Sequence, residues 1–450
     1  MQTRRTAVIG GGLGGLTAAR DLAATGRAVT VYEGSPVIGG KLRTASVAGV
    51  AVDVGAEAML ARRPEGVDLA QAVGLDVVHP ATTSSAVWTR GALRPLPRSV
   101  MGVPGDVAQV AASGILDAAG LDRLSHEEPG PAVDDDVSVG DLVAARLGDE
   151  VVDRLVEPLL GGVYAGHARL LSARATVPQL AAWAGGSLLE AAASALVSAP
   201  AGPVFAGVEG GLGRLPTAIA LDAGFHVRIG SPVVGLRRSP TGFTLVTGPT
   251  NAYVEIEVDE VVLATPAAPT ARLLADIAPA AAAELAGIDY ASMAVVTVAF
   301  DADGLDRPAG SGFLVPPVDG RTIKASTFSF NKWDWVRTAG NGLLLLRTSI
   351  GRHREESVLQ VPDEELVAAS LSDLRDAIGL AARPVDTHVQ RWGGGLPQYA
   401  VGHVDRVARV RAAVDAVPGL AVCGAAYDGV GIPAVIASAR RAAASLVAAE

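Results

Sequence analysis

The pattern of apolar and polar positions at the start of the chain predicts a strand, a helix and a second strand. Residues 6–9 and 28–32 are short apolar runs, whereas residues 13–24 carry apolar positions at helical spacing. A helix that connects two such strands forms a βαβ unit, which places the strands side by side and parallel. We therefore predict an α/β fold.

The next part of the chain has mainly helical spacing. Residues 64–74 are predicted as a helix and residues 87–96 as a hairpin. From residue 107 to residue 199 there are few strand patterns, and helices are predicted over 139–147 and 150–159. This region predicts a helical subdomain.

Strand patterns return in the second half. We predict strands over residues 225–236, 242–247, 253–258, 260–266, 293–300, 322–328, 343–350 and 420–424, and helices over residues 363–378 and 434–449. The run 260–266 is apolar at nearly every position, which is typical of a buried parallel strand, so we expect it to rejoin the first sheet. The runs at 293–300, 322–328 and 343–350 predict a second sheet.

A glycine-rich turn joins the first strand to the first helix. Gly10 permits a tight turn, Gly12 permits close approach of the backbone to a pyrophosphate, and Gly15 permits close packing of helix on strand. The helix N-terminus would hold the phosphates, and Glu33 would accept hydrogen bonds from a ribose hydroxyl group. The sequence therefore predicts a dinucleotide site formed by Gly10, Gly11, Gly12, Leu13, Gly14, Gly15 and Glu33.

Two further turns narrow the choice of dinucleotide. A Gly-Gly-Lys turn with a following arginine begins six residues after Glu33, where pyridine-nucleotide dehydrogenases seldom have one. A second turn of small residues follows the predicted strand end at residues 52–54 and would let the backbone approach a flavin ring. The residues predicted to contact a flavin in these turns are Gly39, Gly40, Lys41, Arg43, Gly55, Ala56, Glu57 and Ala58.

Composition and charge exclude several classes of protein. The 450 residues suggest two or three domains, and the formal net charge is −10. Because no basic block is interleaved with aromatic residues, we expect no nucleic-acid partner. Cys423 is the only cysteine, which excludes an internal disulfide and suits a reducing cytoplasm. The seven histidines lack metal-ligand spacing, so we expect no metal, and we expect His403 to shape a turn.

The most apolar long stretch is residues 180–199. It is as long as a membrane span, but it is rich in alanine and contains Gly185, Gly186 and Glu190. We expect a buried, packed helix here, and the alternative is a helix that rests on a membrane surface. We expect no export signal before the nucleotide-binding motif.

Five separated segments are similar to those of a known family. They are residues 93–104, with Leu-Arg-Pro-Leu-Pro and Met-Gly-Val-Pro; residues 157–166, Glu-Pro-Leu-Leu-Gly-Gly-Val-Tyr-Ala-Gly; residues 210–216, Gly-Gly-Leu-Gly-Arg-Leu-Pro; residues 392–403, with Trp392 and Pro-Gln-Tyr-Ala-Val-Gly-His; and residues 424–433. With the flavin-type turns, and in the same order, they resemble the oxygen-dependent porphyrinogen oxidases of the flavin monoamine oxidase-like superfamily.

This resemblance implies a Rossmann-type FAD-binding domain assembled from discontinuous segments, with a mixed-sheet substrate domain and a helical subdomain. The expected boundaries are residues 1–86, 204–268 and 388–450 for the FAD-binding domain, 87–106 and 269–387 for the substrate-binding domain, and 107–203 for the helical subdomain. The resemblance also implies FAD contacts from Val234, Trp392, Gly424, Val430, Gly431 and Ile432.

The reaction of this family removes six electrons and six protons from a porphyrinogen in three rounds, with O2 as acceptor and H2O2 as by-product. The N5 atom of the flavin would carry the chemistry, so the resemblance implies no catalytic side chain. The arginine-rich, lysine-poor composition suggests a GC-rich Gram-positive genome, and such lineages resemble the branch that oxidises coproporphyrinogen III in haem biosynthesis. The motifs fit protoporphyrinogen IX equally well.

Cations are expected to hold the propionate groups of such a substrate, because a guanidinium group can bind a carboxylate with two hydrogen bonds. The candidates are Arg63, just past the second flavin turn, and Lys332 with Trp333, in a predicted loop beside the cavity. For Arg63 the alternative is an ordinary surface salt bridge. The resemblance further implies hand-over of the product to a ferrochelatase and peripheral contact with the inner face of the membrane, and it leaves the oligomeric state open.

Other classes of protein share part of the pattern. Amine oxidases and carotenoid desaturases have the first flavin motifs but lack the segment 397–403. A non-catalytic protein that holds a flavin or a tetrapyrrole is a further alternative, and the flavin-type turns at both ends of the chain argue against it.

Overall fold

A five-stranded parallel sheet forms the first layer of the computed structural model, which describes residues 3–132, 135–222, 224–248, 252–304 and 307–448. Its strand order is β12 (His226–Arg228), β2 (Ala28–Tyr32), β1 (Arg5–Ile9), β16 (Glu260–Leu263) and β22 (Leu420–Val422). Neighbouring strands are parallel throughout this sheet. The prediction that residues 260–266 rejoin the first sheet is confirmed, because β16 lies between β1 and β22.

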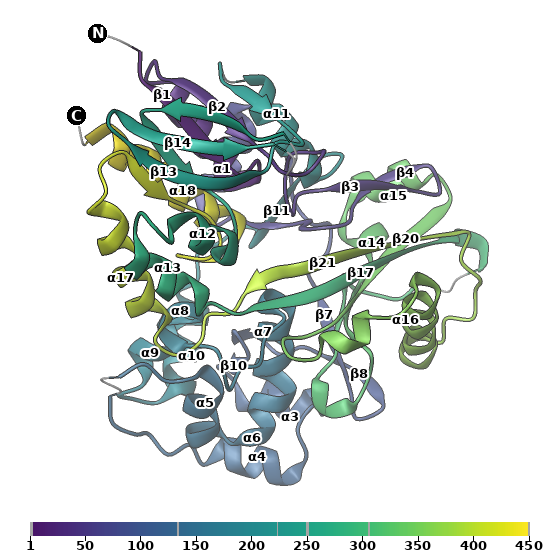
Figure 1. Ribbon diagram of the computed structural model, residues 1–450. Coiled ribbons are helices and arrows are strands. Elements are labelled where there is room, and N and C mark those ends of the chain that lie inside the picture. Colours follow the sequence, from purple (N-terminus) through teal and green to yellow (C-terminus); the bar gives the residue numbers. More distant parts are fainter. Residues whose placement is uncertain (1–2, 133–134, 223, 249–251, 305–306, 449–450) are drawn as a thin grey trace.

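Helices from the two ends of the chain pack together on one face of this sheet (Figure 1). These helices are α1 (Leu13–Ala23) and α18 (Ile432–Ala448), supported by α2 (Pro64–Ala72) and α11 (Leu215–Asp222). Leu16, Leu22 and Ile436 are fully buried in their common core. Helix α18 begins two residues before the predicted helix, and the predicted end at residue 449 lies outside the described residues.

The other face of the parallel sheet is covered by a three-stranded antiparallel sheet and by helices. The strands are β13 (Val233–Ser239), β14 (Gly242–Thr247) and β15 (Val254–Val258), and the helices are α12 (Ala267–Leu274), α13 (Pro279–Ala286) and α17 (His403–Asp415). The prediction of one strand over residues 225–236 is wrong. Gly230, with φ of 59°, and Pro232 break it into β12 and β13, which belong to different sheets.

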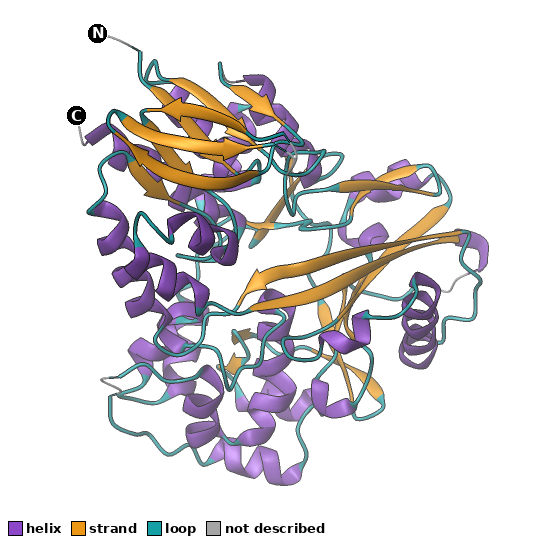
Figure 2. Cartoon of the chain, viewed as in Figure 1, coloured by secondary structure: helices purple, strands orange, loops and turns teal. Residues whose placement is uncertain are grey.

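The second large sheet has seven strands and mixed pairing (Figure 2). Its order is β21 (Asp386–Pro397), β17 (Tyr290–Asp301), β20 (Leu343–Ile350), β19 (Ile323–Thr327), β18 (Gly312–Leu314), β7 (Ser85–Thr89) and β8 (Ala92–Pro95). Strands β18 and β7 pair in parallel, whereas β17 pairs antiparallel with both of its neighbours. Helix α16 (Asp363–Ile378) packs on one face through Leu366 and Leu374. The predicted α/β class with a mixed second sheet is confirmed.

Short elements lie outside the two large sheets. They are β3 (Thr44–Val47), β4 (Val50–Asp53), β5 (Met59–Leu60), β6 (Val77–Val78), β9 (Ser99–Val100), β10 (Val103–Pro104), β11 (Phe205–Val208), α14 (Ser329–Lys332) and α15 (Asp334–Gly340). The hairpin β3–β4 leads directly into the predicted flavin turn at residues 55–58.

The helical region lies at the bottom of the view in Figure 1. It contains α3 (Val107–Ser113), α4 (Ala118–Ser125), α5 (Val139–Leu147), α6 (Asp149–Val151), α7 (Glu157–Tyr164), α8 (Ala173–Thr176), α9 (Pro178–Trp183) and α10 (Leu188–Val197). The predicted helix over 150–159 is part of a longer helical run, in which a π-helical segment, Val152–Val156, joins α6 to α7.

The single helix predicted over residues 180–199 is wrong. Two helices, α9 and α10, occupy this stretch, and residues 185–186 lie between them. Both residues are glycines, which are poor helix formers, so the break falls where the helix is weakest. None of the helices in the described part of the chain is long and apolar enough to cross a bilayer.

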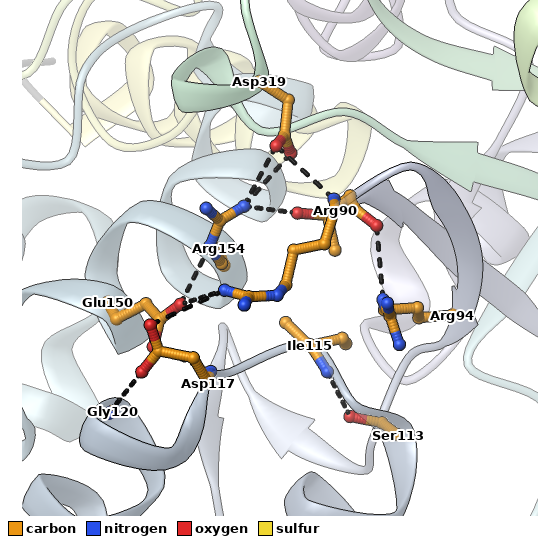
Figure 3. Close-up of polar contacts among 10 residues, drawn as sticks. Arg90, Arg94, Ser113, Ile115, Asp117, Gly120, Glu150, Arg154 and Asp319 are labelled. Atoms are coloured by element: carbon orange, nitrogen blue, oxygen red, sulfur yellow. Dashed lines mark hydrogen bonds and ion pairs between the residues drawn. The ribbon is translucent and has the colours of Figure 1, made fainter.

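Charged side chains join the helical region to the second sheet (Figure 3). Arg90, in the turn between β7 and β8, donates from Nη1 to Oε1 of Glu150 at 3.0 Å. Arg154, in the π-helical segment, donates from Nε to the same oxygen at 3.1 Å and pairs with Oδ1 of Asp319 at 3.1 Å. Glu150 is therefore shared by two arginines that come from different regions.

The division of the chain into domains stays a prediction. The predicted boundary at residue 388 falls inside β21, which is a strand of the seven-stranded sheet. Helix α17 was not predicted.

Candidate functional site

The glycine-rich turn after β1 has the geometry of an anion cradle. A Cβ atom at Gly15 would overlap the carbonyl oxygen of Gly10, so the helix can approach the strand only with glycine there. A Cβ at Gly12 would meet no atom within 4 Å, which leaves space in front of the helix. No side chain caps the N-terminus of α1, so its first N–H groups are available to a ligand. A buried helix N-terminus with free N–H groups and open space fits a pyrophosphate.

Glu33 lies beside this cradle at the carboxyl end of β2. Its Oε2 atom accepts a hydrogen bond from the N–H of Gly11 at 2.6 Å, and its Oε1 atom accepts one from Ser35 at 2.7 Å. Two backbone donors therefore hold the carboxylate at the edge of the cradle, where the ribose of a dinucleotide is expected to lie.

The Gly-Gly-Lys turn packs directly on the cradle. Gly39 has φ of 104°, and its N–H donates to the carbonyl of Gly11 at 2.8 Å. Gly40 also has a positive φ, 57°, which a residue with a side chain adopts only at a cost. Burial lowers the pKa of Lys41 to about 8. The guanidinium carbon of Arg43 lies 5.7 Å from the ring centroid of Trp392.

The second flavin turn is fixed by close contacts. A Cβ at Gly55 would overlap the carbonyl oxygen of Lys41, and the N–H of Ala56 donates to that oxygen at 3.2 Å. The indole N–H of Trp392 donates to the carbonyl of Val54 at 3.1 Å. Ala58 packs against the small core around Trp333. The structure thus brings together the two predicted flavin turns and Trp392.

The C-terminal segment closes on the N-terminus of α1. A Cβ at Gly14 would lie 3.3 Å from Cγ1 of Val435 and 3.6 Å from Cα of Gly424. Ile432 is buried in the core that contains Leu13. The carbonyl of Gly431 accepts from the N–H of Val435, and Val430 packs against the helical region. Gly424 and the start of α18 therefore lie beside the glycine-rich turn, whereas Val430 packs on the helical region.

A buried ion cluster supports the second flavin turn. Nζ of Lys332 lies 2.7 Å from Oε1 of Glu57, and Nε of Arg347 lies 3.4 Å from Oε2. Burial alone would raise the pKa of Glu57, but Arg347 and Lys332 together lower it to about 2. Arg347 also donates from Nη1 to the carbonyls of Asp53 and Gly55, at 2.9 and 3.0 Å. One arginine of β20 thus binds both the backbone of the turn and its acidic side chain.

Sequence reasoning missed Arg347 and Asp53. The signal for Arg347 was its place after four leucines in an apolar strand, where a charge requires a buried partner. Asp53 accepts hydrogen bonds from the N–H groups of Leu212 and Gly213 at 2.8 and 2.9 Å, and burial raises its pKa to about 6. Asp53 connects the turn to residues 210–216, which are one of the five segments that resemble the known family.

The remaining predicted residues lie apart from the cradle or are already paired. Arg63, whose side chain is 45% exposed, pairs with Glu65 at 2.6 Å. Lys332 ends helix α14 and does not lie in a loop, and Trp333 is buried, with its ring against Gly207. Val234 is half exposed on β13. The roles of these four residues as ligand contacts stay predictions.

A cavity of about 390 Å³ lies beside Trp392. Its lining residues include Met293, Leu359, Gln360 and Arg391. The same indole ring would lie 3.1 Å from a Cβ at Gly55, so it separates this cavity from the flavin turn. Within the described residues, no group of three or more His, Cys, Asp or Glu side chains could hold a metal ion.

Residues 13–447 match the family model described as flavin containing amine oxidoreductase. The chain belongs to this family. A Mycobacterium leprae protein named coproporphyrinogen III oxidase is 38% identical to it over 458 residues, which cover 98% of each chain. A Bacillus subtilis protein of the same name is 30% identical over 454 residues, which cover 96% of this chain and 95% of the other. A solved structure from Exiguobacterium sp. 255-15, described as a candidate protoporphyrinogen oxidase, is 31% identical with a TM-score of 0.88, and all of both chains is covered.

Membership of the flavin containing amine oxidoreductase family confirms several predictions. The resemblance inferred from the five segments is confirmed. The predicted FAD cofactor and the prediction of an oxidoreductase are confirmed as well. The cradle fits this cofactor, because open space, free N–H groups and an acidic residue meet at one helix N-terminus.

Proposed function

We propose that this protein is an FAD-dependent oxidase that converts coproporphyrinogen III to coproporphyrin III in haem biosynthesis. One coproporphyrinogen III gives up six electrons and six protons, and three O2 take them up as three H2O2. The observation that carries this proposal is the 38% identity to the Mycobacterium leprae coproporphyrinogen III oxidase over 98% of both chains.

The bound flavin supplies the oxidising chemistry. The residues of this chain bind the dinucleotide, orient the flavin ring and enclose it. The glycine-rich turn and Glu33 bind the dinucleotide through N–H groups and a fixed carboxylate. The turn at residues 53–57 forms a wall for the flavin ring, and Arg347 and Lys332 hold that wall in place. No side chain has to act as an acid or base, because formation of the aromatic ring provides driving force for loss of each proton.

For the propionate groups, Arg63 is the stronger of the two predicted cations. Within the described residues its guanidinium group pairs with Glu65 alone, and because this guanidinium group is 45% exposed, the pair contributes only about 0–1 kcal/mol, so a propionate group can replace Glu65. The charge of Lys332, in contrast, is already used by buried Glu57. We therefore assign substrate contact to Arg63 and a supporting role to Lys332 and Trp333.

Anaerobic mixing tests the proposed activity. Purified flavin-loaded protein is mixed with coproporphyrinogen III without O2, and we expect loss of the flavin absorbance. On admission of air, porphyrin fluorescence should appear with three H2O2 for each porphyrin. Flavin absorbance that stays unchanged would overturn the proposal, and bleaching by putrescine in place of the porphyrinogen would identify an amine oxidase.

Protoporphyrinogen IX is the second candidate substrate. It is favoured by the similarity to the Exiguobacterium structure described as a candidate protoporphyrinogen oxidase. The ratio of kcat/KM for the two porphyrinogens decides between them, and our proposal requires the larger value for coproporphyrinogen III.

The cellular setting is also part of the proposal. We infer that the protein acts in the cytoplasm, with peripheral contact at the inner face of the membrane, and passes coproporphyrin III to a ferrochelatase. Co-sedimentation with anionic lipid vesicles tests the membrane contact. Faster iron insertion from enzyme-bound than from free coproporphyrin III would support direct hand-over, and equal rates would contradict it.

A further inference from the structure

Lys324 is a buried lysine without a partner. It lies on β19 at a bulge, where the pairing with β20 shifts between Ile323 and Ala325. Only 3% of the residue is exposed. Among the described residues, no carboxylate forms an ion pair with its ammonium group and no atom accepts a hydrogen bond from it. An ammonium group in this state is unfavourable, because it has lost most of its water without gaining an acceptor.

A second buried cation lies close to Lys324. Arg352 follows β20, is 5% exposed, and donates from Nη2 to the carbonyl of Val315 at 3.3 Å. Its one ion pair, with Glu355, is long at 3.8 Å, and that carboxylate is 48% exposed. Burial, followed by the charge of Arg352, lowers the pKa of Lys324 to about 7. Within the described residues, the two neighbouring cations thus share a single ion pair, which is long and whose carboxylate is half exposed.

Both cations lie on the side of the sheet that faces α7. Glu157 of α7 is one of the charges that act on Arg352, and α7 contacts β18 and β19. Helix α7 lies in the middle of the molecule (Figure 1), yet Gly162 is exposed and Val163 is 43% exposed. A Cβ at Gly162 would meet only the side chain of Leu314, at 3.7 Å. Gly162 and Val163 of α7 are therefore accessible next to β18.

The same face of the sheet leads to the flavin turn. Arg347 and Ser349 alternate with buried positions on β20, and both are half buried. Arg347 binds the carbonyls of Asp53 and Gly55. Strand β20 ends at Ile350, and Arg352 follows two residues later, after Gly351 with φ of 94°. Strand β20 and the turn after it thus connect the flavin turn with the cation pair.

We propose that Lys324 and Arg352 form a binding site for a propionate group of the substrate, at the end of β20 that lies away from the flavin turn. This inference rests on the proposed function, because it identifies which residues hold the porphyrinogen. A carboxylate would accept hydrogen bonds from the ammonium group and from the guanidinium group, and it would restore the charge balance of the pair. An uncharged ester at the same position would not.

Binding of the oxidised product tests the proposal without turnover. Coproporphyrin III and its uncharged tetramethyl ester are titrated into the flavin-loaded protein, and tryptophan fluorescence reports the Kd. For Lys324→Met we expect the affinity for coproporphyrin III to fall about tenfold or more, with the affinity for the ester unchanged. Lys324→Arg should retain most of the affinity. Arg237→Gln, which removes an exposed cation on β13, is the matched control and should change neither Kd.

Thermal unfolding distinguishes a loss of ligand binding from a loss of fold stability. Loss of an unpaired buried ammonium group should leave the Tm of the Lys324→Met protein unchanged or raise it, while the rise in Tm on adding coproporphyrin III should shrink. If that variant does not fold, Arg352→Gln is measured in the same way. Equal Kd values for wild type and variant would overturn this inference and leave the proposed function standing. Failure of the wild type to bind coproporphyrin III would instead count against the proposed function.

Discussion

Lys332 donates a hydrogen bond to Glu57 across 275 positions of sequence, with Nζ 2.7 Å from Oε1. The pair joins helix α14, which lies between strands β19 and β20 of the second sheet, to the turn that is expected to face the flavin. Arg347 completes the cluster from β20. Lys332, predicted as a cation for the substrate, therefore supports the turn that is expected to face the flavin.

Removing the cation of this pair should destabilise the fold. Lys332→Met leaves Glu57 buried with Arg347 as its remaining partner, and we expect the free energy of unfolding to fall by about 3 kcal/mol. Urea unfolding measures the change. Arg337→Gln is the control, because Arg337 belongs to an exposed pair with Asp334 and should change stability by about 0–1 kcal/mol. Equal losses in the two variants would contradict a buried role for Lys332.

The pH dependence of the unfolding free energy should reveal the titration of the Glu57 carboxyl group. Its pKa in the folded protein is about 2, against an ordinary value of 4.5. A carboxyl group with a lowered folded pKa stabilises the fold above its unfolded pKa, and this contribution is lost as the pH falls toward the folded pKa. The stability difference between wild type and Glu57→Gln should therefore be constant above pH 4.5 and shrink between pH 4.5 and about 2. Urea unfolding at a series of pH values measures this difference in unfolding free energy. A difference that grows as the pH falls would contradict the prediction.

Local pattern was sufficient for several buried elements. Strand β20 (Leu343–Ile350) and helix α16 (Asp363–Ile378) begin and end at the predicted residues, because β20 starts as a continuous apolar run and the apolar positions of α16 have helical spacing. The glycine-rich turn and Glu33 could also be predicted, since backbone approach to a phosphate requires those residue types at that spacing.

Features that depend on distant segments could not be predicted in this way. The partners of Glu57 come from α14 and β20, and nothing near residue 57 indicates them. Helix α17 was missed although Val407, Val410 and Val414 are buried at helical spacing, because arginines between them hide the narrow apolar stripe. His403, expected to shape a turn, donates its N–H to the carbonyl of Ala400 and begins this helix.

Glu33→Ala should weaken retention of FAD. The substitution removes the acceptor of the Gly11 and Ser35 N–H groups and the predicted partner of the ribose. We expect a loss of about tenfold in FAD affinity, as for one or two hydrogen bonds to a charged group. The ratio of flavin to protein after gel filtration measures it, and a ratio equal to that of the wild type would remove the ribose role of Glu33.

Arg63→Ala separates substrate binding from stability. The exposed pair with Glu65 contributes about 0–1 kcal/mol, so the unfolding free energy should hardly change. If Arg63 holds a propionate, KM should rise more for coproporphyrinogen III, with four carboxylates, than for protoporphyrinogen IX, with two. Arg237→Ala, at another exposed pair, should leave both KM values as they are. Equal effects of Arg63→Ala on the KM values of the two substrates would show that Arg63 forms only an ordinary surface salt bridge.

Gly55→Ala should displace the flavin turn as a unit. The new methyl group would overlap the carbonyl oxygen of Lys41 and press on the ring of Trp392, so the backbone has to move away from the wall that Arg347 holds. Overpacking of this kind costs about 1–3 kcal/mol, and here the strain falls on residues that are expected to touch the cofactor. We therefore expect the variant to lose FAD on dilution and to show altered flavin fluorescence. Gly224→Ala is the matched control, because a Cβ at Gly224 meets no atom within 4 Å and should leave the flavin content unchanged. A Gly55→Ala protein with the flavin content and spectrum of the wild type would show that this turn does not contact the cofactor.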